Sequence, residues 1–519
     1  MTHSADRIAR YTALGPWTGE TIGQLLMAHV EARPDATAII DPPNKAGLLD
    51  GPVKRLTWAG LHQEVERVAG ALHAAGVGPG GVVAVQLPNS VELAVTYLAV
   101  LRLGAAVTPF PVQYREYELA QLLPLSGASL LVTGRESRAP EGTRVLAWPG
   151  DLEKTEAGAA PAYRADPADL VTICWTSGTE TTPKGVPRCH YDWLAVEALC
   201  TAAPALTSDD VILNPFPMVN MAGIGGVFLP WLRSGATLVQ HHPFDLPVYL
   251  GQISAENVTY TLAPPALLTM LLLKEVPVPP SLTRIGSGSA PLPPSMVRGW
   301  QERHGIAIIN FFGSNEGITL LSDPEHMPDP EVRARYFPRP GAPGAPALLD
   351  HVEVRLVSPE GEEITEPGVP GELRLNGPTV FAGYLPGTAA AEPFDERGDL
   401  RTGDLFEIAG AQGQYLRYVD RAKDIIIRGG MNIAPAELEA LLSGHPAIAE
   451  VAVAGFADEV LGEKVCAVVV PRGELDLESV VAFLRGKGIA SYKLPERLEL
   501  VEALPRNPVG KILKRELKL

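Results

Sequence analysis

Short apolar runs alternate with helix-forming segments through much of the first half of this chain. Residues 82–87 form a run suited to a buried strand, Ser90 can cap the helix that follows, and residues 105–110 return as a second strand. Further runs of the same kind occupy residues 171–174, 211–214, 237–240 and 259–263. Apolar strands that alternate with helices imply a parallel sheet covered by helices on both faces. The pattern therefore predicts doubly wound α/β structure.

The second half of the chain follows a different pattern. Alternating segments at 352–357 and 372–375 are separated by Pro and Gly, as in a small antiparallel barrel or sheet. A chain of 519 residues also exceeds the roughly 250–300 residues at which one core stops growing. We expect an α/β plus α+β protein with two parts. An N-terminal body, residues 1–420, would hold two doubly wound α/β subdomains and a small β-barrel, and residues 421–519 would form a mobile C-terminal α+β lid.

Charge and cysteine content argue against several classes of protein. The 43 Lys and Arg against 60 Asp and Glu leave a net charge of −17, which disfavours nucleic-acid binding because a basic face supplies most of that affinity. The most membrane-like stretch, residues 93–107, is interrupted by Arg102 and falls short of a membrane span, so a buried helix and strand are expected there. The 4 cysteines include no CxxC pair and predict no disulfide framework. We expect a reduced, cytoplasmic protein with no membrane span.

Residues 176–185, Thr-Ser-Gly-Thr-Glu-Thr-Thr-Pro-Lys-Gly, place small and hydroxylated residues between an apolar strand and a predicted helix. Backbone N–H groups of small residues, the hydroxyls and Lys184 could surround an anion such as phosphate. The segment is not a Walker A loop, because no Gly-Lys-Ser/Thr follows the spacer. A solvated turn is the alternative, and composition alone does not decide between the two.

Four later segments carry chemically versatile residues. Residues 310–317, Asn-Phe-Phe-Gly-Ser-Asn-Glu-Gly, could offer an aromatic ring to a base and a carboxylate to Mg²⁺, although alone they favour a strand-to-helix corner. Asp404 follows a tight turn and can accept ribose hydroxyl protons. Residues 420–439 indicate a charged corner, a strand, a glycine turn and a helix. Residues 505–512 form a tail loop that presents Lys511, for which solubility is the simplest interpretation.

In this order, the five segments resemble the motifs of the adenylate-forming superfamily: acyl- and aryl-CoA synthetases, carrier-protein adenylation domains and beetle luciferases. The similarity runs from about residue 24 to residue 514. It implies an enzyme that uses ATP and Mg²⁺ to convert a carboxylic acid to an acyl-adenylate and then transfers the acyl group to a thiol. Gly429 and Gly430 would leave room for pantetheine, which favours a CoA thioester over oxygenation.

The resemblance also implies roles for individual residues. The phosphate loop would consist of Thr176, Ser177, Gly178, Thr179, Glu180, Thr181 and Lys184. The rest of the nucleotide would contact Ser289, Ala290, Pro291, Asn310, Phe311, Phe312, Gly313 and Ser314, with Asp404 and Arg421 at the ribose. Glu316 would hold Mg²⁺, Lys511 would bridge the acid and the α-phosphate during adenylation, and Lys423 would be the hinge. Asn220, Met221 and Gly288 would form the acid pocket, and Arg428, Gly429 and Gly430 would face CoA.

Two residues of the phosphate loop depart from the family's usual Thr-Ser-Gly-Thr-Thr-Gly-x-Pro-Lys-Gly: Glu180 replaces a hydroxylated residue and Thr181 replaces a glycine. A carboxylate about 4 Å from a phosphate would cost up to roughly 4 kcal/mol at an effective dielectric constant near 20. ATP brings its β- and γ-phosphates into this loop, whereas an acyl-adenylate carries only the α-phosphate. The hypothesis is that adenylation is impaired while thioester formation from a supplied adenylate persists. The alternative, with Glu180 directed to solvent and ordinary ATP binding, has equal weight.

We therefore expect an acyl-CoA ligase for an apolar carboxylic acid. Its cofactors and substrates would be ATP or acyl-AMP, CoA and Mg²⁺, and an upstream adenylating enzyme would be a partner if adenylation is impaired. A full two-step synthetase, an adenylation enzyme that loads a carrier protein, and a nucleotide-binding protein without turnover are the alternatives. Members of the superfamily are monomers or homodimers, and the same is expected here.

Overall fold

The computed structural model describes residues 2–134, 139–154, 158–176, 183–317, 319–389, 392–428, 431–458, 461–487, 489, 491–506, 512–517 and 519. Its strands form four sheets, two of them mainly parallel and two mainly antiparallel. The helices are α1 Ala5–Leu14, α2 Ile22–Ala32, α3 Trp58–Ala74, α4 Val91–Arg102, α5 Glu116–Ser126, α6 Asp151–Lys154, α7 His190–Ala202, α8 Met221–Gly223, α9 Leu229–Ser234, α10 Leu246–Ala255, α11 Pro265–Leu273, α12 Pro294–His304, α13 Pro330–Arg335, α14 Pro435–Leu442 and α15 Leu477–Gly486.

The largest sheet has eight strands in the order β14-β13-β12-β11-β9-β10-β1-β2 and is parallel except at its two edges. Its strands are β1 Thr37–Ile40, β2 Arg55–Thr57, β9 Val211–Asn214, β10 Thr237–Gln240, β11 Tyr260–Leu262, β12 Arg284–Gly288, β13 Ala307–Gly313 and β14 Thr319–Ser322. The expected strands at 211–214 and 237–240 are confirmed. The expected strand-to-helix corner at 310–317 is wrong, because β13 turns back and pairs with the antiparallel strand β14.

The second mainly parallel sheet has six strands in the order β6-β5-β3-β4-β7-β8. Its strands are β3 Val82–Gln86, β4 Ala106–Pro109, β5 Leu130–Thr133, β6 Val145–Ala147, β7 Leu170–Thr176 and β8 Lys184–Cys189. The phosphate loop was expected to lead directly into a helix, and this is also wrong. Lys184 begins the edge strand β8, which pairs antiparallel with β7, and helix α7 starts only at His190.

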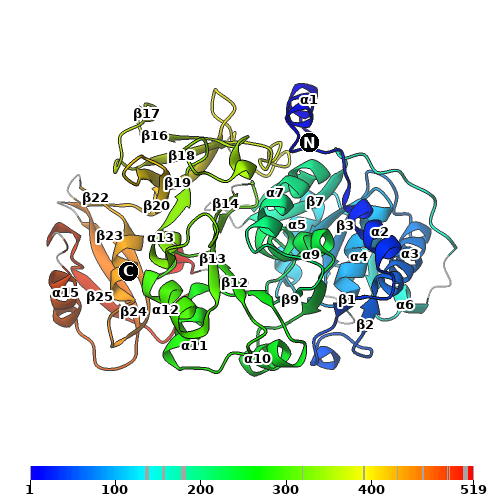
Figure 1. The fold of residues 1–519 in the computed structure, drawn as a ribbon, viewed down its shortest axis with the longest axis horizontal. Coiled ribbons are helices and arrows are strands. Elements are labelled where there is room, and N and C mark those ends of the chain that lie inside the picture. Colours follow the sequence, from blue (N-terminus) through cyan, green and yellow to red (C-terminus); the bar gives the residue numbers. More distant parts are fainter. Residues whose placement is uncertain are drawn as a thin grey trace.

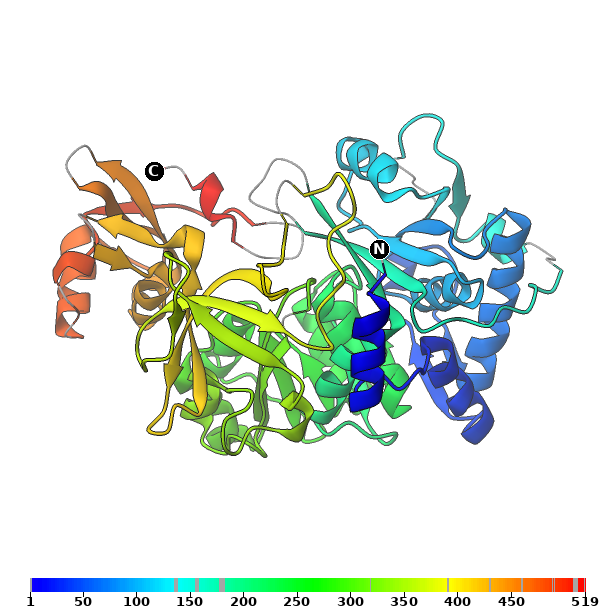
Figure 2. The same cartoon turned by 90° about the horizontal axis from the view of Figure 1, so that it is seen from above.

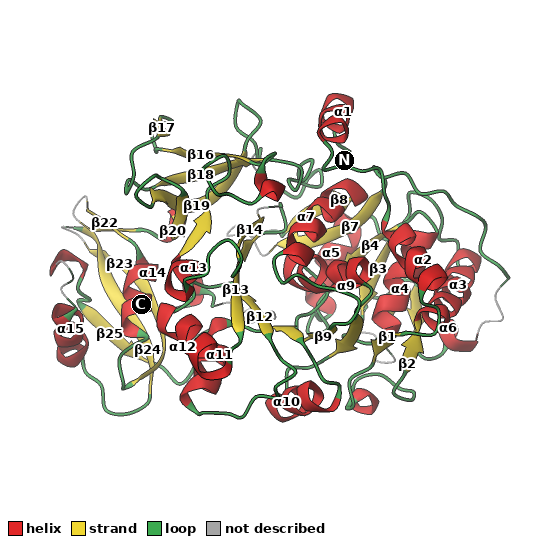
Figure 3. Ribbon diagram, viewed as in Figure 1, coloured by secondary structure: helices red, strands yellow, loops and turns green. Residues whose placement is uncertain are grey.

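The two mainly parallel sheets share one apolar core. Ile39 and Leu238 of the eight-stranded sheet belong to the same buried cluster as Val83 and Val107 of the six-stranded sheet. Every residue from Val91 to Leu101 of α4 is buried, which confirms the interpretation of this apolar stretch as a core helix that runs into a buried strand. Figure 3 shows the helices α2, α3 and α4 gathered beside these strands. The doubly wound α/β body expected from the sequence is therefore present.

A six-stranded antiparallel sheet occupies the place expected for the small barrel. Its order is β15-β20-β19-β18-β16-β17, and its strands are β15 Tyr336–Pro338, β16 Glu353–Val357, β17 Glu363–Ile364, β18 Gly371–Asn376, β19 Leu400–Ala409 and β20 Tyr415–Arg421. This sheet lies above the eight-stranded sheet in Figure 1, next to β13 and β14. Phe312 of β13 packs against Phe406 of β19, so the two sheets meet at the predicted nucleotide site.

The C-terminal strands form a separate α+β unit. Strands β21 Ile426–Arg428, β22 Met431–Ile433, β23 Ile448–Asp458, β24 Gly462–Pro471 and β25 Arg497–Leu500 pair in one sheet. Helices α14 and α15 cover it through a core of their own, which includes Leu438, Val465 and Leu484. This unit lies at one end of the long axis of the molecule, and α2 and α3 lie at the other (Figures 1 and 2).

The first helix is bonded to the antiparallel sheet. The guanidinium group of Arg7 in α1 donates to Asn376 Oδ1 at 3.0 Å and to the Gly377 carbonyl at 2.6 Å. Trp17 Nε1 donates to the Pro378 carbonyl at 3.1 Å, and His3 Nε2 lies 2.5 Å from Asp192 Oδ1. The chain preceding α2 therefore ties α7 to the segment that follows β18.

Within these described residues, no helix is both long enough and apolar enough to cross a membrane.

Candidate active site

The turn between β13 and β14 carries Glu316, the predicted Mg²⁺ ligand. Its carboxylate Oε1 accepts a hydrogen bond from the Tyr384 hydroxyl at 2.9 Å. The ammonium group of Lys184 lies 5.2 Å from the centre of the Tyr384 ring, in a cation–π contact. The structure thus brings the lysine at the end of the predicted phosphate loop and the predicted metal ligand to the same tyrosine. A carboxylate together with substrate phosphates is a donor set that suits Mg²⁺, so these residues fit that ion.

Several predicted residues lie outside the described part of the chain. These are Ser177, Gly178, Thr179, Glu180 and Thr181 of the phosphate loop, Gly429 and Gly430 of the CoA-facing loop, and Lys511. Nothing is described of the Lys423 side chain either. Thr176 ends β7 and pairs with Lys184 of β8 across the start and end of the loop.

Two buried hydroxyls on β12 and on the turn that follows β13 lack hydrogen-bond partners among the residues that the structure describes. They are Ser287 Oγ on β12 and Ser314 Oγ on the turn. A buried polar group without a partner costs free energy, so both hydroxyls are available to a bound ligand. Ser314 is the residue predicted to contact the α-phosphate, and its unpaired oxygen fits that role.

The predicted ribose site is formed by neighbouring strands. Asp404 of β19 is paired in register with Arg421 of β20, and their side chains form an ion pair in which Arg421 Nε lies 2.9 Å from Asp404 Oδ1. Burial is the largest effect and lowers the pKa of Arg421, but the charge of Asp404 and those of further acidic groups together raise the pKa overall. Asp404 is only 2% exposed, and the Arg421 guanidinium group lies against its carboxylate. An ionised carboxylate can accept hydrogen bonds from both hydroxyls of a ribose.

The residues predicted to contact adenine occupy the carboxyl ends of β12 and β13. Phe312 packs edge-on against Phe406 with ring centres 5.1 Å apart. Gly288 approaches β13 so closely that a Cβ atom would lie 2.3 Å from the Phe311 carbonyl oxygen, so a side chain is excluded there. Ser289 has a left-handed φ of 70°, and the three residues Ser289, Ala290 and Pro291 are exposed.

Two predicted contact residues have structural duties. The Asn310 amide nitrogen donates to the Arg333 and Ala334 carbonyls, each at 3.1 Å. Asn220 caps α8, because its side-chain oxygen accepts from the Ala222 backbone N–H at 3.1 Å. This capping gives a physical reason for an asparagine at position 220.

The lid residue Arg428 is engaged within its own unit. Its Nη2 lies 2.7 Å from Glu496 Oε1. Asp420, at the end of β20, accepts a 2.8 Å hydrogen bond from the Ala436 backbone N–H at the start of α14. Arg506 and Ile512 form an isolated antiparallel bridge on either side of the segment that carries Lys511.

Sequence reasoning assigned no role to Arg188 or to Tyr384. Arg188 stands on β8 among apolar neighbours, and its partners are backbone carbonyls from distant segments. No sequence pattern marks such acceptors. Tyr384 follows Gly383, and only the fold shows that its hydroxyl reaches Glu316.

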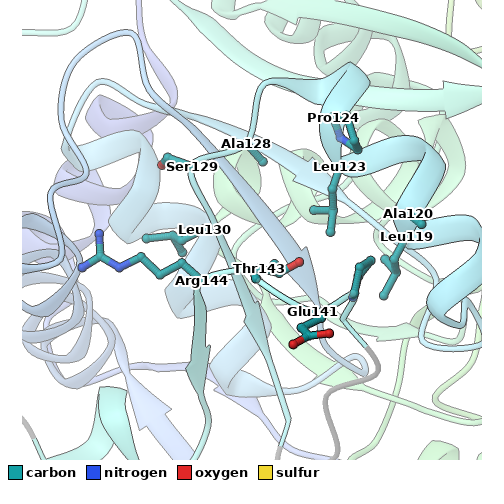
Figure 4. A pocket seen from close by; sticks show the side chains of 12 residues that line it. Leu119, Ala120, Leu123, Pro124, Ala128, Ser129, Leu130, Glu141, Thr143 and Arg144 are labelled. Atoms are coloured by element: carbon teal, nitrogen blue, oxygen red, sulfur yellow. The ribbon is translucent and has the colours of Figure 1, made fainter.

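A surface pocket between α5 and the segment before β6 is unrelated to this site (Figure 4). Leu119, Leu123, Glu141 and Arg144 are among its lining residues, and it includes none of the predicted site residues.

Comparison with known families identifies the chain. The family described as "AMP-binding enzyme" matches residues 26–385, and the "AMP-binding enzyme C-terminal domain" matches residues 437–511. The chain belongs to the AMP-binding enzyme family. The predicted adenylate-forming superfamily is thereby confirmed, and this AMP-binding enzyme is an acid–thiol ligase of the AMP-forming type.

Curated relatives resemble the AMP-binding enzyme over most of its length. A salicyl-AMP ligase / salicyl-S-ArCP synthetase of Mycobacterium tuberculosis is 32% identical, covering 99% of this chain and 93% of the relative. A medium-chain fatty-acid–CoA ligase of Escherichia coli is 31% identical with the same coverage, 99% and 93%. A feruloyl-CoA synthase of Amycolatopsis is 33% identical over 89% of this chain and 93% of its own.

Solved structures agree with this assignment. The o-succinylbenzoate CoA synthetase of Bacillus subtilis, in complex with its acyl-adenylate intermediate, superposes with a TM-score of 0.81 at 26% identity and covers 95% of this chain and 97% of its own. The same synthetase is also known in complex with ATP and a magnesium ion. The large N-terminal and small C-terminal domains expected from the sequence are confirmed by these neighbours.

Proposed function

We propose that this AMP-binding enzyme makes an acyl-CoA thioester from an apolar carboxylic acid through an acyl-adenylate, and that thioesterification of a supplied adenylate is its dominant activity. The observation that supports a ligase site is the convergence of Lys184 and Glu316 on Tyr384, together with the Asp404–Arg421 pair on neighbouring strands. Relatives named for medium-chain fatty acids, feruloyl and indoleacetate support an acid of apolar character. The part of the proposal that concerns impaired adenylation rests on the sequence, at Glu180 and Thr181.

The charges around the phosphate loop support a preference for the adenylate. Lys184 is the loop's own cation, and Glu180 adds a carboxylate four residues before it in the same loop. ATP would bring its β- and γ-phosphates to this carboxylate, whereas an acyl-adenylate carries a single phosphate. Coulomb repulsion therefore weighs more heavily on the first half-reaction than on the second.

In the second half-reaction the residues act mainly by binding and orienting. The CoA sulfur forms a bond to the acyl carbon, the bond from that carbon to the AMP oxygen breaks, and the thiol proton is released to solvent. Asp404 and Arg421 would hold the ribose, and Ser314 would hold the α-phosphate so that AMP is a well-positioned leaving group. When bound, Mg²⁺ at Glu316 would neutralise phosphate charge.

The C-terminal residues complete the proposal. The body would extend over residues 1–420 and the lid over residues 421–519, with Lys423 as the hinge between them. Lys511 would serve adenylation, and Arg428, Gly429 and Gly430 would face CoA after the lid rotates. An upstream adenylating enzyme would supply the adenylate, and the protein would act in the cytoplasm as a monomer or homodimer.

The decisive experiment compares the two half-reactions in the same preparation. Wild-type enzyme should convert a synthetic acyl-adenylate and CoA to thioester but should exchange pyrophosphate into ATP poorly. Glu180→Thr combined with Thr181→Gly should raise the exchange rate by up to about a thousandfold, since it removes the charge repulsion and restores the glycine. Thioesterification by the double variant should change little, which makes it the internal control. Pyrophosphate exchange by the wild type at the rate of the double variant would contradict the impairment and leave a full two-step synthetase.

A carrier-protein product is the second candidate. The Mycobacterium tuberculosis relative is named a salicyl-S-ArCP synthetase and covers nearly the whole chain. Supplying the acyl-adenylate with CoA in one reaction and with a phosphopantetheinyl carrier protein in another separates the two. Faster acylation of the carrier would favour the second candidate. Adenylate binding without any thioester would instead indicate a protein without turnover.

A further inference from the structure

Arg188 is a completely buried cation on β8, at 0% exposure. Its guanidinium group donates to three backbone carbonyls from three separate segments: Asn315 at 2.8 Å, Thr379 at 2.7 Å and Asp192 at 3.0 Å. It also lies 4.6 Å from the centre of the Trp193 ring. An arginine offers several donors in a rigid, planar arrangement, so one side chain can fix several carbonyls at defined positions.

One of these carbonyls directly precedes Glu316 in the chain. Three successive carbonyls of the turn have donors from elsewhere: Asn315 O accepts from Arg188, Glu316 O from the Phe381 backbone N–H at 3.0 Å, and Gly317 O from the Thr379 hydroxyl at 2.7 Å. Arg188 also binds the Thr379 carbonyl, at 2.7 Å. The guanidinium group therefore holds both the turn and the segment that pairs with it.

Arg188 also lies on the strand that begins at Lys184, four positions earlier. Strand β8 carries Lys184 to Tyr384 at its start and Arg188 to the Asn315 carbonyl further along. Tyr384 in turn donates to Glu316. Strand β8 is thus linked to the Glu316 turn twice. Lys184 reaches the Glu316 carboxylate through Tyr384, and Arg188 bonds the carbonyl of the preceding residue, Asn315.

Burying a cation costs free energy that burying an apolar side chain does not. Removing a charge from water costs several kcal/mol, and an apolar side chain of similar size packs without that cost. The Asp192 carboxylate, which faces His3, supplies a compensating negative charge near Arg188. An apolar residue could not supply the bonds to the Asn315 carbonyl of the turn and to the Thr379 carbonyl of the segment packed against it.

We propose that Arg188 is a positioning residue, which sets the placement of the Glu316 carboxylate in the active site by holding the backbone carbonyls of Asn315 and Thr379. The proposal rests on the proposed function, because it takes Glu316 to be the residue that matters for activity.

The test is a double-mutant cycle between Arg188→Lys and Glu316→Gln. Lysine keeps the charge but has no planar array of donors, so Arg188→Lys should lower kcat/KM about tenfold or more. If Arg188 acts through Glu316, the same change made in the Glu316→Gln background should lower kcat/KM far less. The rates are measured in whichever half-reaction the wild type performs, from acyl-adenylate and CoA or from acid, ATP and CoA. If the hypothesis of impaired adenylation is wrong, the cycle is measured with acid, ATP and CoA. The expected coupling between Arg188→Lys and Glu316→Gln stays the same.

Arg333→Lys is the matched control. Arg333 is also 0% exposed and donates to the Ile308 and Met327 carbonyls at 2.8 and 2.7 Å, but it makes no bond to the Glu316 turn. It should lower the melting temperature without coupling to Glu316→Gln. If Arg188→Lys does not fold, Arg188→Gln, whose planar amide keeps one donor group, takes its place in the same cycle.

Two results would overturn the proposal. One is additivity, in which Arg188→Lys, or Arg188→Gln in its place, lowers kcat/KM equally in both backgrounds. The other is an unchanged kcat/KM for Glu316→Gln alone. In that case the Glu316 carboxylate would not contribute to activity, and its placement would not matter.

Discussion

His190, the first residue of α7, is a buried histidine whose ring serves the fold. Its Nδ1 accepts a hydrogen bond from the Ile22 backbone N–H at 3.2 Å. Burial lowers the pKa of His190 to about 4. The folded protein thus binds this proton less readily than the unfolded chain, where the pKa of histidine is about 6.5. Its contribution to stability is complete above pH 6.5 and is lost as the pH falls toward 4.

We predict that the free energy of unfolding decreases from pH 7 to pH 4.5, with His190 accounting for up to about 3 kcal/mol of the difference between the two limits. His190→Gln keeps an acceptor for Ile22 and should reduce this dependence. Urea denaturation at several pH values measures it. Burial lowers the pKa of His242 to about 4 as well, so His242→Gln should reduce the remaining dependence. An identical pH dependence in wild type and His190→Gln would contradict the prediction.

Single residues also show how far sequence reasoning reaches. Glu316, Asp404 and Arg421 were predicted from motif resemblance, and the structure gives each of them a partner in the expected region. The capping duty of Asn220 was not predictable, because it depends on the backbone direction of α8. Arg188 was not predictable either, since an arginine in sequence normally indicates exposed surface.

At the scale of elements, the β13–β14 hairpin determines where Glu316 lies. Gly317 closes this turn with a left-handed φ of 107°. A Cβ atom at Gly317 would lie 2.0 Å from the Thr379 carbonyl oxygen, which is backbone and cannot swing aside. The turn and the 379–381 segment can therefore pack this closely only with glycine at position 317.

Gly317→Ala should lower the free energy of unfolding by about 3 kcal/mol and the activity by a large factor, because the turn must separate from Thr379. Gly305→Ala is the control, since Gly305 also has a left-handed φ, of 66°, but nothing lies within 4 Å of its would-be Cβ. That change should cost about 1 kcal/mol and leave kcat/KM unaltered. Thermal denaturation and steady-state kinetics of both variants check the prediction. Equal losses of stability and activity in the two variants would show that the left-handed backbone conformation, and not the contact with Thr379, determines the effect.

The elements themselves were predicted unevenly. Strands β9 and β10 were predicted correctly because short, mainly apolar runs indicate buried strands, and both strands are largely buried. Strand β8 was missed because it contains Gly185 and Pro187, which are depleted in strands. The fold tolerates Pro187 since β8 is the edge strand of its sheet.

At the scale of the whole molecule, the ion pair between Arg428 and Glu496 bears on the lid. Arg428 is proposed to face CoA, yet the Glu496 carboxylate lies 2.7 Å away and competes for it. Partly exposed ion pairs contribute little net stability, so the competition is weak but measurable.

Glu496→Gln should lower the KM for CoA about threefold in the thioester-forming reaction, because it frees Arg428 without removing bulk. Arg428→Gln should raise that KM. Glu437→Gln is the matched control, because Glu437 pairs with Lys493 at 2.6 Å in the same unit without touching Arg428. A KM for CoA that is insensitive to both Arg428→Gln and Glu496→Gln would place Arg428 outside the CoA site.

The attachment of α1 has a practical consequence for anyone who trims the gene. The match to the "AMP-binding enzyme" family begins at residue 26, yet Arg7 and Trp17 bond to residues 376–378, and His3 contacts Asp192 close to Arg188. A variant that begins at residue 26 would lack His3. The Asp192 carboxylate, which is 1% exposed, would then lose the imidazole that it contacts. Such a product would be expected to express poorly, and a loss of yield should not be mistaken for a defect in chemistry.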